Sequence, residues 1–121
     1  MSKVVHFEIP TTNPEKSCDF YSKVFGWKFS KWGEMPYWLA ESGPKDEPGI
    51  WGAISMKSGH NMTVVNTIDV DNVDNIIEGI KANGGEVISN KMAVPTIGWI
   101  VYFKDPDGNV HGALQSDPEA K

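Results

Sequence analysis

His6 and Glu8 lie two residues apart near the start of the chain, and their side chains are the ones best suited to chemistry there. Apolar and polar residues alternate in residues 4–9, so a strand would place both side chains on one face. A carboxylate in an apolar cavity has a raised pKa and can act as a general base, which makes Glu8 the expected catalytic residue of any acid–base step. His6 could contact a bound ligand, or it could be a half-buried histidine paired with Glu8 or a backbone group.

Large aromatic rings are the second feature that could serve a binding site, because the chain has five tryptophans in 121 residues. Rings on a concave sheet face would stack against a flat or apolar ligand, whereas other rings would fill the core or a subunit contact. The alternation of apolar and polar residues along the strands does not decide which rings point into the cavity. The ring-bearing residues that we expect to bind ligand are Trp38, Trp51, Trp99 and Tyr102.

The elements that must position these residues occur twice. Residues 7–29 align without a gap on residues 66–88, and residue class and turn residues agree in both copies. The first copy predicts a helix over residues 13–25, begun by Asn13 before a proline and stopped by Gly26. Its expected buried stripe is Pro14, Ser17, Cys18, Tyr21, Val24 and Phe25; in the second helix the stripe is Val73, Ile76, Ile77 and Ile80, closed by Gly84-Gly85.

Each copy predicts a βαβββ module, which makes the fold class α+β with helices on one face of each sheet. The modules should span residues 1–60 and 61–121 of a single domain. Their bare sheet faces would form a cavity walled by His6, Glu8 and their counterparts. The expected strands are 4–9, ended by Pro10, then 27–32, 36–41, 50–55, 63–69, 86–91, 98–104 and 109–115.

Charge and cysteine content limit the classes of function. The net charge of −5, with no Lys/Arg cluster, argues against a nucleic-acid partner. The single cysteine, Cys18, allows no intrachain disulfide and is expected to be a small packing residue. No apolar leader or membrane-spanning stretch is evident, so we expect a cytoplasmic protein without a membrane partner.

These residues and modules together resemble a known family. The opening His6-Phe-Glu-Ile-Pro, the later Phe20-Tyr21 and Phe25-Gly26-Trp27, and the closing turn 105–109 are similar to the vicinal oxygen chelate superfamily. That group includes glyoxalase I, bleomycin-resistance proteins and extradiol dioxygenases. The resemblance implies a paired-sheet cup that usually holds one divalent metal, and it implies a homodimer.

The metal-ligand positions that the resemblance implies can be checked one by one. The first-strand position of module one falls on His6, and its repeat partner is Val65. The last-strand position of module two falls on Gly112, and its repeat partner is Gly52. A catalytic zinc or nickel site needs three or four protein ligands, so His6 would be only a remnant of the set. We expect no cofactor, while a divalent metal held by His6, Glu8 and a third group stays open.

Three functions follow as hypotheses. The first is a metal-free protein that binds a small aromatic or apolar molecule in the sheet cavity. The second is a metal-dependent lyase or isomerase of the glyoxalase I type, in which a metal polarises a carbonyl and a carboxylate moves a proton. The third is a non-catalytic dimeric interaction module, which would show a large apolar surface patch.

Overall fold

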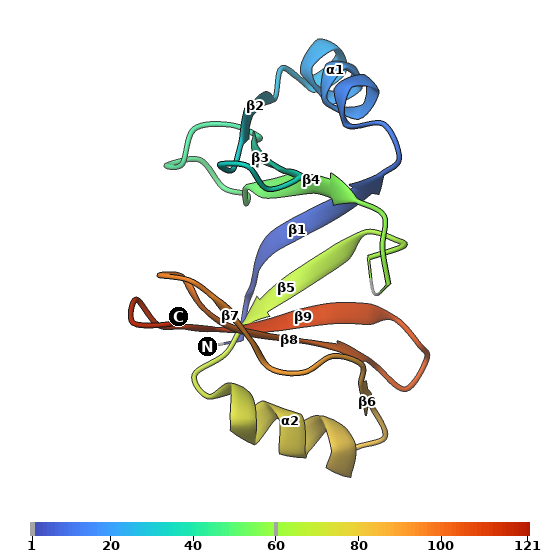
Figure 1. The fold of residues 1–121 in the computed structure, drawn as a ribbon, viewed down its shortest axis with the longest axis vertical. Coiled ribbons are helices and arrows are strands. Elements are labelled where there is room, and N and C mark those ends of the chain that lie inside the picture. The colour runs from blue at the N-terminus through green and yellow to red at the C-terminus, as the bar shows by residue number, and fades with distance from the viewer. Residues whose placement is uncertain (1, 60) are drawn as a thin grey trace. The chain divides into compact units, whose positions relative to one another are not determined.

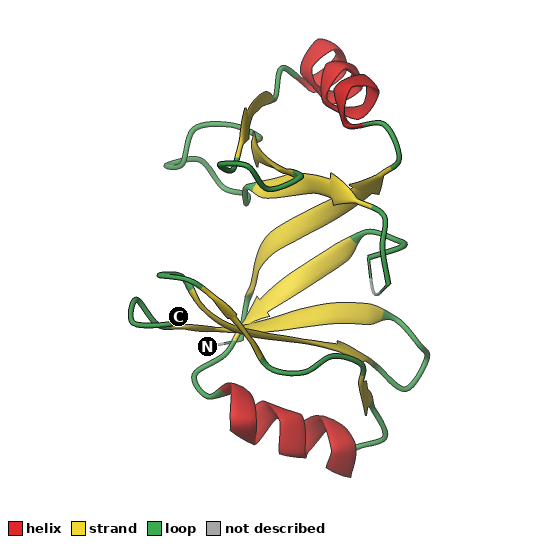
Figure 2. Cartoon of the chain, in the orientation of Figure 1, coloured by secondary structure: helices red, strands yellow, loops and turns green. Residues whose placement is uncertain are grey.

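The computed structural model describes residues 2–59 and 61–121, and the chain divides into two compact units. The N-terminal unit is His6–Val65; the C-terminal unit is Asn66–Lys121 together with Met1–Val5. In each unit one helix lies on one side of that unit's own strands (Figure 2). The predicted division into modules 1–60 and 61–121 stays a prediction.

The N-terminal unit has the predicted order of one strand, one helix and three strands (Figure 1). Its elements are β1 (Val4–Thr11), α1 (Pro14–Phe25), β2 (Lys28–Lys31), β3 (Tyr37–Glu41) and β4 (Gly52–Met56). The strands are ordered β2-β3-β4-β1. Strands β2, β3 and β4 pair antiparallel, and β4 pairs with β1 in parallel. The parallel pair is possible because α1 and two strands separate β1 from β4 in the chain.

The C-terminal unit repeats this order with one short strand added. Its elements are β5 (Val65–Asp69), α2 (Val73–Ala82), β6 (Glu86–Val87), β7 (Met92–Val94), β8 (Gly98–Lys104) and β9 (Val110–Ser116). The strand order is β5-β9-β8-β6, with β7 also paired to β8. Strands β5 and β9 are parallel, which matches the parallel pair in the other unit. The predicted α+β fold class of two repeated modules is therefore confirmed.

Local signals placed both helices correctly. The Asn13 side chain accepts a hydrogen bond from the Lys16 amide at 3.1 Å, and Gly26 ends α1 in the left-handed region at φ 74°. The Asn72 side chain accepts a hydrogen bond from the Asn75 amide at 2.9 Å in the same way. Side-chain oxygens satisfy amide groups that have no partner inside the helix. The described helices include none long and apolar enough to cross a membrane.

Several strand boundaries differ from the prediction. Strand β1 continues through Pro10 to Thr11, because pairing with β4 extends over both residues and the Thr11 carbonyl accepts from the Lys57 amide at 3.0 Å. Proline removes one donor but keeps its carbonyl, so the ladder survives. The predicted strand 86–91 contains only the two residues of β6, and β7 was not predicted because its three residues lack a periodic pattern.

The two helices pack differently against their strands. In the C-terminal unit Val70, Val73, Val101 and Ala113 form a buried core, and Ile76 and Ile77 of α2 pack against it. Helix α1 has no fully buried residue, so its predicted buried stripe is only partly confirmed: Pro14, Ser17, Cys18 and Tyr21 are half-buried. Two members of that stripe, Val24 and Phe25, are 57% and 60% exposed. The rings of Tyr21 and Phe25 instead contact Trp27, at centroid distances of 5.0 and 6.0 Å.

This contrast predicts very different costs for one substitution in the two helices. Val73→Ala in α2 should lower the free energy of unfolding by about 1–3 kcal/mol, because Val73 is 1% exposed and its removal leaves a cavity. Val24→Ala in α1 should change it by less than about 0.5 kcal/mol, because Val24 is largely in solvent. Urea unfolding of the two variants measures both values. Equal losses would contradict the described packing of α1.

Candidate ligand site

Five residues of the N-terminal unit share the sheet face opposite α1. His6 and Glu8 alternate with Phe7 along β1, and Phe7 contacts Trp27, which stacks on Tyr21 of α1. Strand register then places other residues on the His6 face: Ala53 pairs with Glu8, and Ser55 pairs with Tyr37. The sequence prediction that His6 and Glu8 share a face is confirmed by this register. We call this surface the open face of the N-terminal unit.

His6 and Tyr37 form the central contact of the open face. His6 Nε2 and Tyr37 Oη are 2.5 Å apart, and the two rings are nearly parallel at 14°. Burial lowers the pKa of the His6 imidazole below its ordinary value, which favours the neutral ring at pH 7. The neutral imidazole either accepts a hydrogen bond at Nε2 from the Tyr37 hydroxyl or donates its Nε2–H to that oxygen, depending on its tautomer. The pair is a polar anchor that can donate to or accept from a bound molecule.

Buried polar groups extend this anchor. Glu8, Ser55 and Asn61 are all buried, with exposures between 5% and 8%. The Asn61 side-chain amide donates a hydrogen bond to Ser55 Oγ, while Asn61 Oδ1 is buried without a partner. A buried acceptor left unpaired costs free energy that a ligand donor can recover. Asn61 is linked to Tyr37 through Ser55, which pairs with Tyr37 in the sheet, and a side-chain shift that exposes its Oδ1 would offer an acceptor to a ligand.

The open face of the C-terminal unit is mostly apolar. Thr67 pairs with Gly112, and both lie on the face away from the core that packs on α2. Val65 alternates with Thr67 on β5 and shares that face. Tyr102 is 7% exposed, and its ring lies where a side chain at Gly112 would reach.

The residues at the family's ligand positions do not form a metal site. Val65, Gly52 and Gly112 carry no ligating side chain, and within residues 2–59 and 61–121 no three His, Cys, Asp or Glu residues gather as a metal requires. Gly52 also lies on the sheet face opposite the one that carries His6 and Glu8. Extending the β1–β4 register pairs Gly52 with Phe7, whose ring would lie 2.4 Å from an added Cβ. In the β5–β9 pair, Gly112 lies opposite Thr67, the repeat partner of Glu8. In the β1–β4 pair, Gly52 lies opposite Phe7, one residue earlier, so it points to the helix side of the sheet.

The tryptophans predicted to bind ligand lie on different surfaces. Trp38 pairs with Ile54 on the face toward α1, and Trp99 packs against the core under α2, with its indole N–H donating to Asp117 at 2.9 Å. Neither ring is on the face that carries His6 or Tyr102. Trp51 donates its indole N–H to the Gly43 carbonyl at 2.7 Å and so holds the loop before β4.

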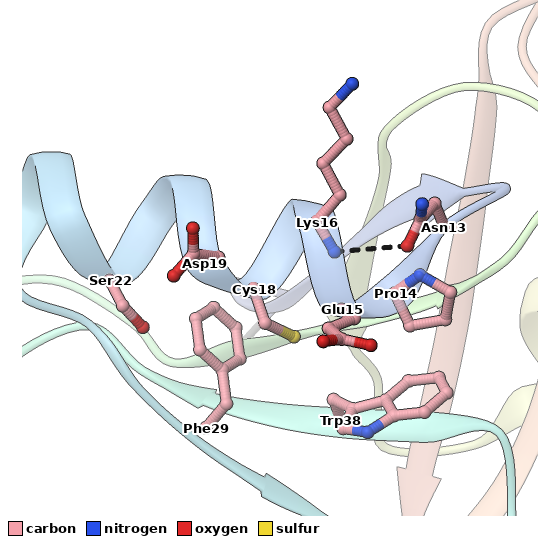
Figure 3. A pocket seen from close by; sticks show the side chains of 9 residues that line it. All are labelled: Asn13, Pro14, Glu15, Lys16, Cys18, Asp19, Ser22, Phe29 and Trp38. Atoms are coloured by element: carbon pink, nitrogen blue, oxygen red, sulfur yellow. Dashed lines mark hydrogen bonds between the residues drawn. The ribbon is translucent and has the colours of Figure 1, made fainter.

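A groove lies between α1 and the strands β2 and β3, with a volume of about 1140 Å³ (Figure 3). The rings of Phe29 and Trp38 come from the strands, and the Cys18 thiol comes from the helix. Cys18 is half-buried, and burial raises the pKa of its thiol, which favours the unreactive protonated form. Cys18 was predicted to be a packing residue, but it lines this open volume.

The lowered pKa of His6 predicts that acid weakens the fold. Between the unfolded pKa of about 6.5 and the lower folded pKa, the unfolded chain binds more protons than the folded chain. This stabilising contribution is complete above the unfolded pKa and is lost as pH falls through the folded pKa. The urea midpoint should therefore decrease from pH 8 to pH 5, and His6→Gln should reduce the decrease. A midpoint drop of the same size in His6→Gln would assign the acid effect to other groups.

The fold and the site define a class: paired βαβββ modules with polar groups on an open sheet face. Residues 3–111 match the family model of the Glyoxalase/Bleomycin resistance protein/Dioxygenase superfamily, so the chain belongs to that superfamily. It is 30% identical over 114 residues to a glyoxylase-like domain-containing protein of Didymella fabae, covering 86% of each chain. It is 31% identical over 120 residues to a lactoylglutathione lyase of Escherichia coli O157:H7, covering 88% of this chain and 87% of the other.

Solved structures agree on the fold. A hypothetical protein of Bacillus halodurans C-125 aligns with a TM-score of 0.66 at 14% identity, covering 99% of this chain and 98% of the other. Methylmalonyl-CoA epimerase of Streptomyces coelicolor aligns with a TM-score of 0.65 at 13% identity, covering 100% and 99%. Such low identity supports the fold alone. The predicted family resemblance is confirmed.

Proposed function

We propose that this superfamily member binds a small aromatic molecule on the open face of its N-terminal unit without the family's full metal site. The observation that carries the proposal is the neutral His6–Tyr37 pair, which occupies the face where metal coordination would otherwise be expected. Three of the four family ligand positions lack a ligating side chain. Hydrogen bonds, rather than metal coordination, are therefore proposed to orient the ligand.

The ligand class follows from the groups on this face. Exposed Leu39 offers apolar contact on this face, while the half-buried His6 and Tyr37 offer polar contact. The unpartnered Asn61 Oδ1 favours a ligand with an O–H or N–H donor. An aromatic ring bearing a phenol or an amide N–H meets both requirements.

The test compares 2-naphthol with 2-methoxynaphthalene, which has the same rings but no donor. Fluorescence titrations are run in the presence of a chelator, so that any binding is independent of divalent metal. We expect 2-naphthol to bind about tenfold more tightly, since a ligand donor would satisfy the buried acceptor of Asn61. In Asn61→Leu the preference should disappear. Equal binding of both compounds, or binding that the chelator abolishes, would contradict the proposal.

A metal-dependent lyase is the second candidate function. The 31% identity to a lactoylglutathione lyase favours it. Its difficulty is that Gly52, Val65 and Gly112 supply no ligand, so His6 and Glu8 would need a third ligand from elsewhere. Metal content per chain separates the two candidates.

A further inference from the structure

We propose that the groove between α1 and strands β2 and β3 is a second binding site, which takes a flat aromatic molecule carrying a positive charge. The groove lies on the helix side of the sheet, whereas His6 and Tyr37 lie on the opposite face. The two sites therefore use different side chains, and each can be tested without the other.

The size of the groove suits a ligand with two or three fused rings. Its volume of about 1140 Å³ lies slightly above the range of small-molecule sites, about 300–1,000 Å³, so a ligand of two or three fused rings has ample room. Phe29 and Trp38 are half-buried and form the aromatic floor contributed by the strands. In Figure 3 both rings lie on the strand side of the groove, facing the helix. Stacking on these two rings would hold a planar molecule.

The groove is open because small side chains face large rings. Pro14, Cys18 and Ser22 recur every four residues along α1 and line the groove opposite Phe29 and Trp38. At the far end of the helix the stacked rings of Tyr21 and Trp27, 5.0 Å apart, fill the space. The ring stack thus supports one end of the helix while small residues leave room under the rest. Residue size therefore explains the open volume.

Charge at the groove favours a cation. In Figure 3 Glu15 extends from the helix toward Trp38, while Lys16 extends away from both rings. Asp19 is paired with Lys23 at 3.0 Å, but across the described ranges Glu15 has no ion-pair partner. Glu15 can therefore meet a positive group that sits over the tryptophan ring.

The Trp38 ring already attracts a cation within the protein. The Lys31 ammonium lies 5.9 Å from the centroid of the Trp38 ring. Ammonium groups at this distance are held by the negative face of the indole. A ligand cation would compete with Lys31 for this ring face and would gain the Glu15 carboxylate in addition.

The test uses proflavine, a flat tricyclic cation, and acridine, which has the same three rings and is neutral at alkaline pH. Cys18 is the only cysteine, so its alkylation by iodoacetamide reports occupancy of the groove directly. Labelling is done at alkaline pH because burial raises the pKa of the Cys18 thiol. We expect proflavine to slow alkylation at lower concentrations than acridine does.

Variants assign the roles of the groove residues. Trp38→Ala should weaken proflavine binding by at least about fivefold. Glu15→Gln should weaken proflavine binding by about twofold to fivefold and leave acridine binding unchanged. Lys31→Met should strengthen proflavine binding, because it removes the competing cation. Trp32→Ala and Glu34→Gln are matched controls outside the groove on the β2–β3 hairpin, and they should leave binding unchanged.

The outcomes separate this site from the open face. His6→Ala should leave the protection of Cys18 by proflavine intact, whatever its effect on naphthol binding. Unprotected Cys18 at saturating proflavine would overturn the groove as a site, and so would unchanged affinity in a folded Trp38→Ala variant. Equal protection by proflavine and acridine, or no effect of Glu15→Gln, would overturn the cationic ligand class.

Discussion

Gly52→Ala should lower the free energy of unfolding by about 1–3 kcal/mol, because an added methyl group would overlap the ring of Phe7. A Cβ at Gly52 would lie 2.4–2.5 Å from three ring carbons, one of them the ring's first atom. Rotation of the ring about its Cβ–Cγ bond leaves that first atom in place, and the ring also contacts Trp27. The strand or the ring must therefore move. Equilibrium urea unfolding measures the loss.

Gly112→Ala is the matched control, because Gly112 is the equivalent position in the other module. Its Cβ would meet Thr67 and Tyr102 at 3.3 Å, so small side-chain shifts suffice. Reduced freedom of the unfolded chain also offsets about 0.4–1 kcal/mol of any strain. We expect the unfolding free energy to change by less than about 1 kcal/mol. Equal losses at both positions would contradict the register that turns Gly52 toward α1.

These two glycines show why the metal positions differ between the units. At Gly112 the face has nearly enough room for a side chain, so packing does not by itself prohibit a ligand there. At Gly52 the Phe7 ring occupies the space, and the position lies on the helix side of the sheet. Substituting a ligand residue at Gly52 would therefore not restore a ligand on the open face.

His6→Ala should weaken 2-naphthol binding by about tenfold or more, because the variant loses the imidazole and leaves the half-buried Tyr37 hydroxyl without that partner. Tyr37→Phe should weaken binding by about fivefold, since it removes only the hydroxyl. Titration of naphthol fluorescence at pH 8, where His6 is neutral, gives both affinities.

Tyr21→Phe is the matched control for Tyr37→Phe. Tyr21 lies on α1 and stacks on Trp27, away from the open face, so its hydroxyl should not affect the ligand. Thermal melts confirm that each variant is folded before titration. Full naphthol affinity in folded His6→Ala and Tyr37→Phe variants would remove the open face from the proposed function.

Local signals explain why much of the fold was predictable. Asn13 and Asn72 sit at helix starts and bond to amides three residues later, so their roles depend only on nearby sequence. The turn at residues 105–109 is equally local: Asp105 accepts from the Asp107 and Asn109 amides at 2.9 Å. A hydrogen bond from the Asn109 side chain is the main cause of the lowered pKa of Asp105.

The candidate site was only partly predictable because it depends on strand register. Alternation placed His6 and Glu8 on one face, but the partner of His6 is Tyr37, 31 residues away across the sheet. No local pattern links Asn61 to Ser55, because Asn61 lies in a loop. The repeat assigned Gly52 to one of the family's ligand positions, yet a one-residue difference in strand pairing turns it away from the face of His6.

The groove beneath α1 depends on side-chain sizes on separate elements. Helical spacing predicted that Cys18 and its neighbours would be buried. It did not reveal that Phe29 and Trp38 face three small residues across an open volume. Periodicity gives the side of a helix that faces a sheet, but it does not give the distance between the two.

Metal content per chain tests the central claim most directly. Elemental mass spectrometry would be applied to untagged protein purified without chelators, with His6→Ala prepared in parallel. The account predicts far less than one divalent ion per chain, with no difference between the two proteins, because only His6 remains of the family's four ligand positions. One divalent ion per chain that is lost in His6→Ala would contradict the account and favour the metal-dependent lyase.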